Sequence, residues 1–197
     1  MVKRFFDLFE HRLIGGGHSH HDLFGFRAGH TTLIRHLDSG VNRAQCAGMT
    51  LAAWILLASL EVTDAAGHRP AKAIAPEGAV AIAGVCNKVR GSEPGSSAMC
   101  ASVMIVMCFR ESGYNLSAVG DGGKAKGPWQ VHSSVAPKTW DEAVRQYLPI
   151  LQHSAVTCVE PLAMLASGSC TNKAGIAISR ARMAEARRVF SVVGGMT

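Results

Sequence analysis

The chain has 197 residues, of which 48% are hydrophobic and 17% are charged; this composition excludes a wholly disordered or fibrous chain, and the length suits one well-cored domain with an appendage. The 20 basic and 14 acidic residues give a net charge of +6, which fits an anionic partner such as a cell-wall polymer, a membrane surface or a nucleic acid. No apolar run reaches the roughly 18 residues of a membrane-spanning helix, which excludes a polytopic membrane protein.

Residues 1–46 differ in composition from the rest of the chain and are expected to form an N-terminal arm. Within 2–14, large apolar residues recur at helical spacing, which predicts an amphipathic helix that docks on its own domain, on a partner or on a membrane surface. The segment 15–22 has the composition of a flexible linker. Its three histidines have no second cluster of ligands beside them, so we expect no metal site there.

Residues 46–60 form an apolar run of 15 residues that ends at Glu61. This length suits the hydrophobic core of a signal peptide better than a membrane span, and Ala65 and Ala66 form a weak cleavage site. The run begins far from the N-terminus for a signal peptide, so a buried helix and an uncleaved anchor remain as alternatives. We assign residues 47–69 to an apolar helix followed by a linker.

The remaining residues, 70–197, are predicted to form one compact, mainly α-helical domain. Pro76 marks the start of a helix whose apolar segment extends to Val89. A second helix begins with a serine cap and ends at Glu111. Residues 112–130 are rich in glycine and predict a loop or a small hairpin. Further helices are expected over residues 140–152, 160–166 and 178–192.

The six cysteines are an even number, which allows 15 different sets of pairings. Cys100 and Cys108 would lie about 12 Å apart on one helix, so they do not bridge each other. Cys158 and Cys170 flank a short stretch that contains a loop, and they are the best candidates for a disulfide. The alternative is that most of the cysteines are reduced and buried. Disulfides would indicate an oxidising compartment.

One stripe of the second helix ends in an ionisable residue. The apolar positions that include Met104 and Cys108 recur at helical spacing, and Glu111 continues the same stripe. Burial and the negative end of the helix dipole both favour the protonated form of this carboxyl. A carboxyl that keeps its proton near neutral pH is suited to general acid catalysis. The alternative is that Glu111 only ends the helix and pairs with Arg110 or Lys124.

Three motifs follow one another in this part of the chain. They are Arg110-Glu-Ser-Gly-Tyr-Asn115, Ala118-Val-Gly-Asp-Gly-Gly123 and Gly127-Pro-Trp-Gln130. Over residues 75–190 the chain resembles the lytic transglycosylase family of the lysozyme-like superfamily. The resemblance implies an α+β lysozyme-like fold, in which a helical bundle carries a small β-hairpin beside the active-site cleft. It also implies an enzyme that needs no cofactor and acts on the glycan strands of peptidoglycan.

The resemblance assigns roles to individual residues. Glu111 is the expected catalytic acid/base, and Ser112 is expected to help position the substrate. Gly127 and Gln130 are expected to shape the glycan groove. Trp129 and Trp140 could stack on sugar faces, as aromatic rings do. The alternative for each of them is packing in the core. The other candidates for contacts with the substrate are Tyr114, Trp129, His132 and Ser167.

One departure from the family pattern affects the site. The family usually carries a tyrosine on a later helix that faces the catalytic glutamate. In the corresponding stretch of this chain, 164–168, Leu165 occupies that position. The change removes a hydroxyl that would orient Glu111 or the sugar. A domain that binds glycan without cleaving it is therefore an alternative.

The reaction implied by the resemblance is cleavage of the β-1,4 bond between N-acetylmuramic acid and N-acetylglucosamine. Glu111 protonates the leaving oxygen and then takes the proton from the muramoyl C6 hydroxyl, which closes a 1,6-anhydro ring. Glycoside hydrolysis commonly uses two carboxylates, and neither Asp121 nor the pair at 141–142 is a convincing second one. Assistance by the N-acetyl group would replace it. Attack by water instead would make the protein a lysozyme.

A second hypothesis is a structural or injection protein of a phage particle, with the lysozyme-like domain as a module that pierces the wall. Residues 1–46 would then dock on other virion or cell-envelope proteins. Both hypotheses imply an extracytoplasmic location, periplasmic or secreted, or a place in the virion. The positive charge comes with no nucleic-acid-binding motif or basic cluster, so we expect no nucleic-acid partner.

Overall fold

The computed structural model describes residues 49–88 and 94–193, and these ranges hold six α-helices, one 3-10 helix and a three-stranded antiparallel sheet. The elements in chain order are α2 (Leu51–Glu61), α3 (Pro76–Cys86), α4 (Pro94–Ser112), β1 (Val119–Gly120), η3 (Asp121–Gly123), β2 (Ala125–Lys126), β3 (Val131–His132), α5 (Trp140–Thr157), α6 (Ala163–Ser167) and α7 (Lys173–Val193). The prediction of a mainly helical fold with a small hairpin is confirmed at this level. The expected N-terminal arm, its linker and Cys46 lie outside the described residues.

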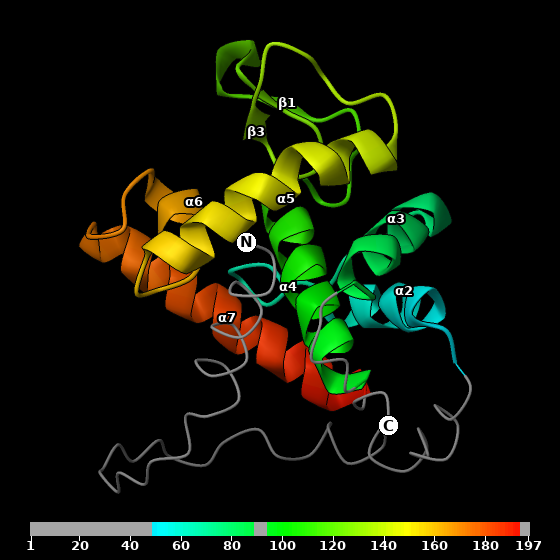
Figure 1. Ribbon diagram of the computed structural model, residues 1–197. Coiled ribbons are helices and arrows are strands. Elements are labelled where there is room, and N and C mark those ends of the chain that lie inside the picture. Colours follow the sequence, from blue (N-terminus) through cyan, green and yellow to red (C-terminus); the bar gives the residue numbers. More distant parts are fainter. Residues whose placement is uncertain (1–48, 89–93, 194–197) are drawn as a thin grey trace, which may run out of the picture.

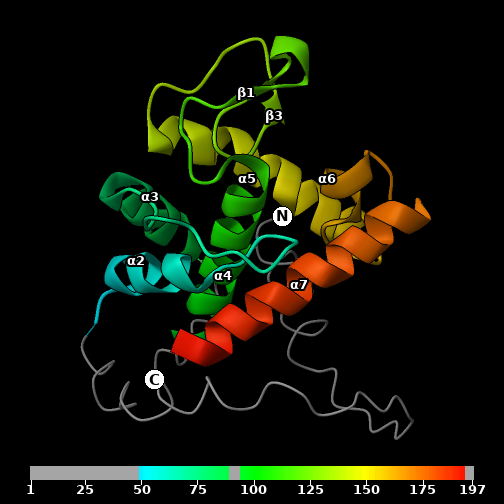
Figure 2. The same cartoon turned by 180° about the vertical axis from the view of Figure 1, so that it is seen from behind.

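Helix α4 is the central element of the fold, with α2 and α3 on one side and α7 on the other (Figures 1 and 2). Residues 100–108 are all buried, so this helix is apolar around its whole circumference rather than along one stripe. A helix of that kind belongs in the middle of a core. Helix α5 crosses the end of α4 that leads to the sheet, and the sheet lies beyond α5 (Figure 1).

Helix α2 belongs to the same hydrophobic core. Trp54, Ile55 and Ala58 are fully buried, and the helix packs on α3, α4 and α7. The sequence predicts a compact unit that begins at residue 70, and the structure corrects this boundary, because the core includes α2. Residues 51–60 of the apolar run thus belong to a helix that is packed into the core on one side. In the ranges 49–88 and 94–193, no helix is long and apolar enough to cross a membrane.

A polar network fixes the end of α2 on α7. The Arg188 guanidinium pairs with Glu185 at 2.8 Å and donates a hydrogen bond to the backbone carbonyl of Glu61. The Glu185 carboxylate also accepts hydrogen bonds from the backbone N–H and the hydroxyl of Thr63, at 2.8 and 3.0 Å. Burial alone would raise the pKa of Glu185, but the hydrogen bonds from Arg188 and Thr63 outweigh it and lower that pKa. The network is therefore fully formed at neutral pH and is lost only in acid.

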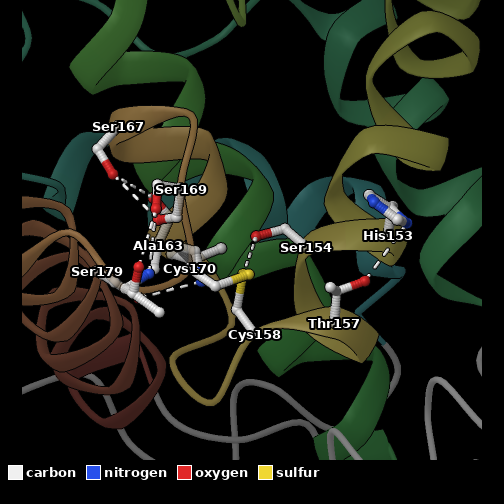
Figure 3. The surroundings of a disulfide bond; sticks show 11 residues. His153, Ser154, Thr157, Cys158, Ala163, Ser167, Ser169, Cys170 and Ser179 are labelled. Atoms are coloured by element: carbon white, nitrogen blue, oxygen red, sulfur yellow. Dashed lines mark hydrogen bonds between the residues drawn. A yellow bond between two sulfur atoms is a disulfide. The ribbon is translucent and has the colours of Figure 1, made fainter.

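Two disulfides connect neighbouring elements. The predicted pair, Cys158 and Cys170, is present as a disulfide that joins the end of α5 to the loop between α6 and α7 (Figure 3). A second disulfide, between Cys86 and Cys100, joins the end of α3 to α4 and was not among the expected pairs. Cys108 is a free thiol whose burial in the core raises its pKa.

Candidate functional site

A cleft of about 420 Å³ lies where the C-terminal end of α4 meets the sheet, α5 and α6. Five of the residues singled out in the sequence line it, whereas Ser112, Tyr114 and Gly127 are outside its lining. The five are Glu111, Trp129, Gln130, His132 and Ser167. The rest of the lining consists of Met107 of α4, Val131, Tyr147 and Ile150 of α5, and residues 164–166 and 168.

Glu111 lies in the last turn of α4, and its side chain is 26% exposed. Its Oε1 lies 2.7 Å from Nη1 of Arg182 on α7, whose side chain is 16% exposed. Such a half-buried ion pair is screened by salt less than a surface pair. Within the described ranges neither Arg110 nor Lys124 pairs with Glu111.

Two stacked rings form the apolar base of the cleft. The ring centroids of Trp129 and Tyr147 are 5.0 Å apart, with 6° between the planes. The Trp129 indole N–H donates a hydrogen bond to the Met104 carbonyl at 3.0 Å, and the Trp140 ring meets it edge-on. Because Trp129 is only 4% exposed, it does not offer an open ring face to a sugar. The main role of both tryptophans is therefore core packing, which is the alternative given above, and not stacking on a sugar.

Tyr147 is a cleft residue whose position the sequence leaves open. The side chain is buried, and its hydroxyl has no hydrogen-bond partner among the residues that the structure describes. Burial raises the pKa of Tyr147 far above its ordinary range; Arg182 opposes the rise, and Glu111 adds to it. A buried phenol thus lies within the electrostatic reach of Glu111. The sequence does contain a signal for this position, because Tyr147 lies seven residues after Trp140 on the buried face of α5.

Ser112 holds the end of α4 to the following loop instead of facing the cleft. Its Oγ is 2.8 Å from the Pro128 carbonyl and accepts a hydrogen bond from the Asn115 backbone N–H at 3.1 Å. The hydroxyl is occupied by these backbone groups. The expected contact with substrate is therefore corrected to a role in placing the 127–130 turn.

Tyr114 lies on the side of α4 that faces α2. Its buried hydroxyl donates a hydrogen bond to the Ser59 carbonyl at 2.9 Å, and its ring packs on Phe109. Tyr114 therefore joins the loop after α4 to α2 and is not a substrate contact. A side chain of this kind is placed by tertiary packing, which its neighbours in sequence do not specify.

Gly127 shapes the turn that carries Gln130. Its φ of +76° is in the left-handed region, and a Cβ at this position would lie 2.6 Å from Cγ of Pro137. Only glycine fits both constraints. The Gln130 side-chain amide donates a hydrogen bond to the Gly127 carbonyl at 2.8 Å. Gly127 thus acts on the groove indirectly, while Gln130 lines it.

His132 and Ser167 lie on opposite walls of the cleft. The His132 Nε2 is 3.1 Å from Oδ2 of Asp121, and both side chains are more than half exposed, at 68% and 61%. The Ser167 hydroxyl contacts the carbonyls of Ala163 and Ser169, each at 3.1 Å, and so closes the end of α6 (Figure 3). The imidazole is therefore accessible to a ligand, whereas the serine hydroxyl is engaged with the backbone.

Helix α6 is short, and contacts on two sides fix its wall of the cleft. The Cys158–Cys170 disulfide closes the segment that contains the helix. The Leu162 backbone N–H, just before the helix, donates a hydrogen bond to Oγ of Ser179 on α7 at 3.0 Å. Leu165, at the position of the expected tyrosine, lines the cleft from this helix. In the described part of the chain, no group of three or more His, Cys, Asp or Glu side chains could hold a metal ion.

The chain matches no family model, no curated protein and no solved structure. Its function is therefore inferred from the residues of the cleft and from the sequence motifs.

Proposed function

We propose that the protein cleaves the β-1,4 bond between N-acetylmuramic acid and N-acetylglucosamine in peptidoglycan as a lytic transglycosylase. Glu111 is the acid/base in this proposal. The observation that carries it is the position of this carboxyl, half-buried at the end of an apolar helix and in the wall of a cleft beside a small sheet. The motif resemblance supplies the substrate class.

The number of carboxyl groups in the cleft favours a mechanism in which one carboxyl serves as both acid and base. Among the residues that the structure describes, Glu111 is the only carboxyl in the lining, whereas the usual hydrolytic mechanisms place a second carboxylate across the scissile bond. Asp121 lies outside the lining and pairs with His132. With one carboxyl, the muramoyl C6 hydroxyl is a better nucleophile than water, because it belongs to the substrate and needs no base besides Glu111.

Glu111 carries the proton through the proposed cycle, with the Arg182 guanidinium 2.7 Å from its Oε1. In its protonated form it gives its proton to the leaving oxygen, and it then accepts the proton of the C6 hydroxyl. The carboxyl ends the cycle as it began it, so no net proton is consumed.

The remaining lining offers both polar and apolar contacts to sugars. Gln130 and the exposed His132 provide hydrogen-bonding groups, and Ile150 and Leu165 provide apolar surface for the C–H faces of the rings. The cleft volume of about 420 Å³ is within the range typical of ligand-binding pockets.

The test is a digest of purified peptidoglycan by the full chain, with the soluble muropeptides weighed by mass spectrometry. We expect products one water lighter than lysozyme fragments, because their ends are 1,6-anhydro rings. Products with reducing ends would show a hydrolase. Retained glycan binding without any soluble product would show a glycan-binding domain that has lost the chemistry.

Replacing Tyr147 by phenylalanine tests whether its unpartnered hydroxyl serves the reaction. Because the hydroxyl has no partner in the described chain, its removal is expected to leave the melting temperature unchanged or slightly raised. The rate at which soluble muropeptides form is expected to fall about tenfold. This is the effect of losing one hydrogen bond that the hydroxyl would form to the substrate or to Glu111 during the reaction.

The matched control is Tyr114→Phe. This buried hydroxyl does have a partner, the Ser59 carbonyl, and lies outside the cleft lining. We expect the control to lose about 1 kcal/mol of stability and no activity. A Tyr147→Phe variant that is destabilised and fully active would assign the tyrosine to the core alone.

A further inference from the structure

A second cavity lies against the ion pair of Glu111 but does not belong to the cleft. Its volume is about 570 Å³, and it shares no lining residue with the cleft. Three elements form it: the turn after α2, the end of α4 and the middle of α7. The lining consists of residues 64–66, Phe109, Arg110, Ile178, Ala181 and Arg182.

Two guanidinium groups line this cavity, and one of them has an acidic partner in the described ranges. Arg182 pairs with Glu111 at 2.7 Å. Arg110 forms no ion pair in the described ranges. Its Nε is buried and has no hydrogen-bond partner among the described residues. Because a buried atom is not accessible from the cavity, it is the charge of the unpaired guanidinium as a whole, and not Nε, that favours an anion here.

The other lining groups narrow the choice of ligand. Asp64 is the one acidic side chain of the lining in the part of the chain that the structure describes. Its carboxylate accepts hydrogen bonds from the backbone N–H groups of Ala66 and His68 and pairs with the His68 ring. Its charge disfavours a dianion such as a phosphate monoester more than a monoanion. Phe109, Ile178 and the alanines form apolar walls, which suit a small aliphatic group next to the charge.

We propose that this cavity binds the carboxylate of a short peptide with small aliphatic side chains, with Arg110 and Arg182 as its cationic contacts. The planar guanidinium fork matches a carboxylate better than an ammonium group would. The inference goes beyond the proposed glycan cleavage and does not need it, although the peptide stems of peptidoglycan are one source of such a group.

Because Arg182 contacts Glu111 on one side and lines the cavity on the other, the two anions share one cation. Peptide binding in the cavity is therefore expected to weaken the hold of Arg182 on Glu111. Conversely, neutralising Glu111 should strengthen peptide binding, since the whole charge of Arg182 then acts on the ligand.

The experiment is a titration of the full chain with N-acetyl-D-alanyl-D-alanine, followed by NMR, and in parallel with its C-terminal amide. We expect the acid to bind and the amide to bind at least about tenfold more weakly, since charge-assisted hydrogen bonds are lost. Arg110→Met should weaken binding of the acid about tenfold or more. Arg187→Met is the matched control, because Arg187 is exposed on α7, outside the cavity, and its loss changes the net charge equally.

Two further variants make the result independent of folding and of catalysis. Arg110→Lys keeps the charge but removes the planar guanidinium fork, and it should bind the acid more weakly than the wild type. Glu111→Gln should bind it several-fold more tightly, whereas Glu160→Gln, which breaks an ion pair with Arg180 outside the cavity, should not. Equal binding of acid and amide, an equal effect of Arg110→Met and Arg187→Met, or no binding of the acid would each overturn the proposal. None of these readouts depends on glycan cleavage.

Discussion

Replacing Glu111 by glutamine is expected to slow the release of muropeptides by about a thousandfold or more. Glutamine is nearly the same size but neither gives nor accepts the proton. In the proposed mechanism one group serves both as the acid for the leaving oxygen and as the base for the C6 hydroxyl. In the ranges 49–88 and 94–193, the cleft lining holds no second carboxyl that could take over either step. The measurement is the initial rate of anhydro-muropeptide formation from purified peptidoglycan.

The substitution also breaks the ion pair with Arg182, so the fold needs its own control. We expect a loss of stability of about 1–3 kcal/mol, because a half-buried guanidinium loses its charged partner and keeps only a neutral amide oxygen as acceptor. Glu160→Gln makes the same chemical change in the pair with Arg180, outside the cleft lining. This control should keep the wild-type rate. A Glu111→Gln protein that is folded and cleaves at the wild-type rate would remove Glu111 from the mechanism.

The helices could be predicted where local signals mark their ends. Pro76 starts α3 as expected, and the 140–152 helix begins at Trp140 with Thr139 as its cap. The ends were harder to place. Helix α5 continues through Pro149 to Thr157, since a proline on its exposed side is tolerated there. Helix α7 begins at Lys173 rather than 178; the overlooked signal is Asn172, whose side chain accepts hydrogen bonds from the N–H groups of residues 174 and 175.

The candidate site could be predicted only in part. Glu111 could be predicted because it stands in the 110–115 motif at the end of an apolar helix, which is a local property of the sequence. Its partner Arg182 comes from a distant helix and belongs to no motif, so only the packing of α4 on α7 brings the two together. The same holds for the two tyrosines: the motif contains Tyr114, but packing places Tyr147 at the cleft and Tyr114 against α2.

The prediction that the compact domain begins at residue 70 was wrong for a related reason. An apolar run of 15 residues has the same composition whether it is a signal peptide or a core helix. What distinguishes them is the set of tertiary contacts. The Ser59 hydroxyl oxygen accepts a hydrogen bond from the Ile74 N–H at 3.1 Å, and its carbonyl accepts one from Tyr114. These contacts link α2 to the segment before α3 and to the loop after α4.

Replacing Trp54 by alanine is therefore expected to destabilise the protein by about 3–5 kcal/mol. The side chain is fully buried, and alanine would leave a cavity in the core that α2 forms with α3, α4 and α7. The measurement is the free energy of unfolding of the full chain in urea. Leu57→Ala is the matched control on the same helix, because that leucine is 52% exposed; it should change the free energy by no more than about 0.5 kcal/mol.

The same reasoning gives the expected behaviour of a chain that begins at residue 67, after Ala66. Such a chain lacks all of α2, which exposes the faces of α4 and α7 that α2 covers. It also lacks the Ser59 carbonyl that Tyr114 binds and the Glu61 carbonyl that Arg188 binds. We expect it to be far less stable than Trp54→Ala, so cleavage at Ala65 or Ala66 would be incompatible with this fold. If Trp54→Ala unfolds like the wild type, α2 is not part of the core, and a domain that begins at residue 70 becomes the better description.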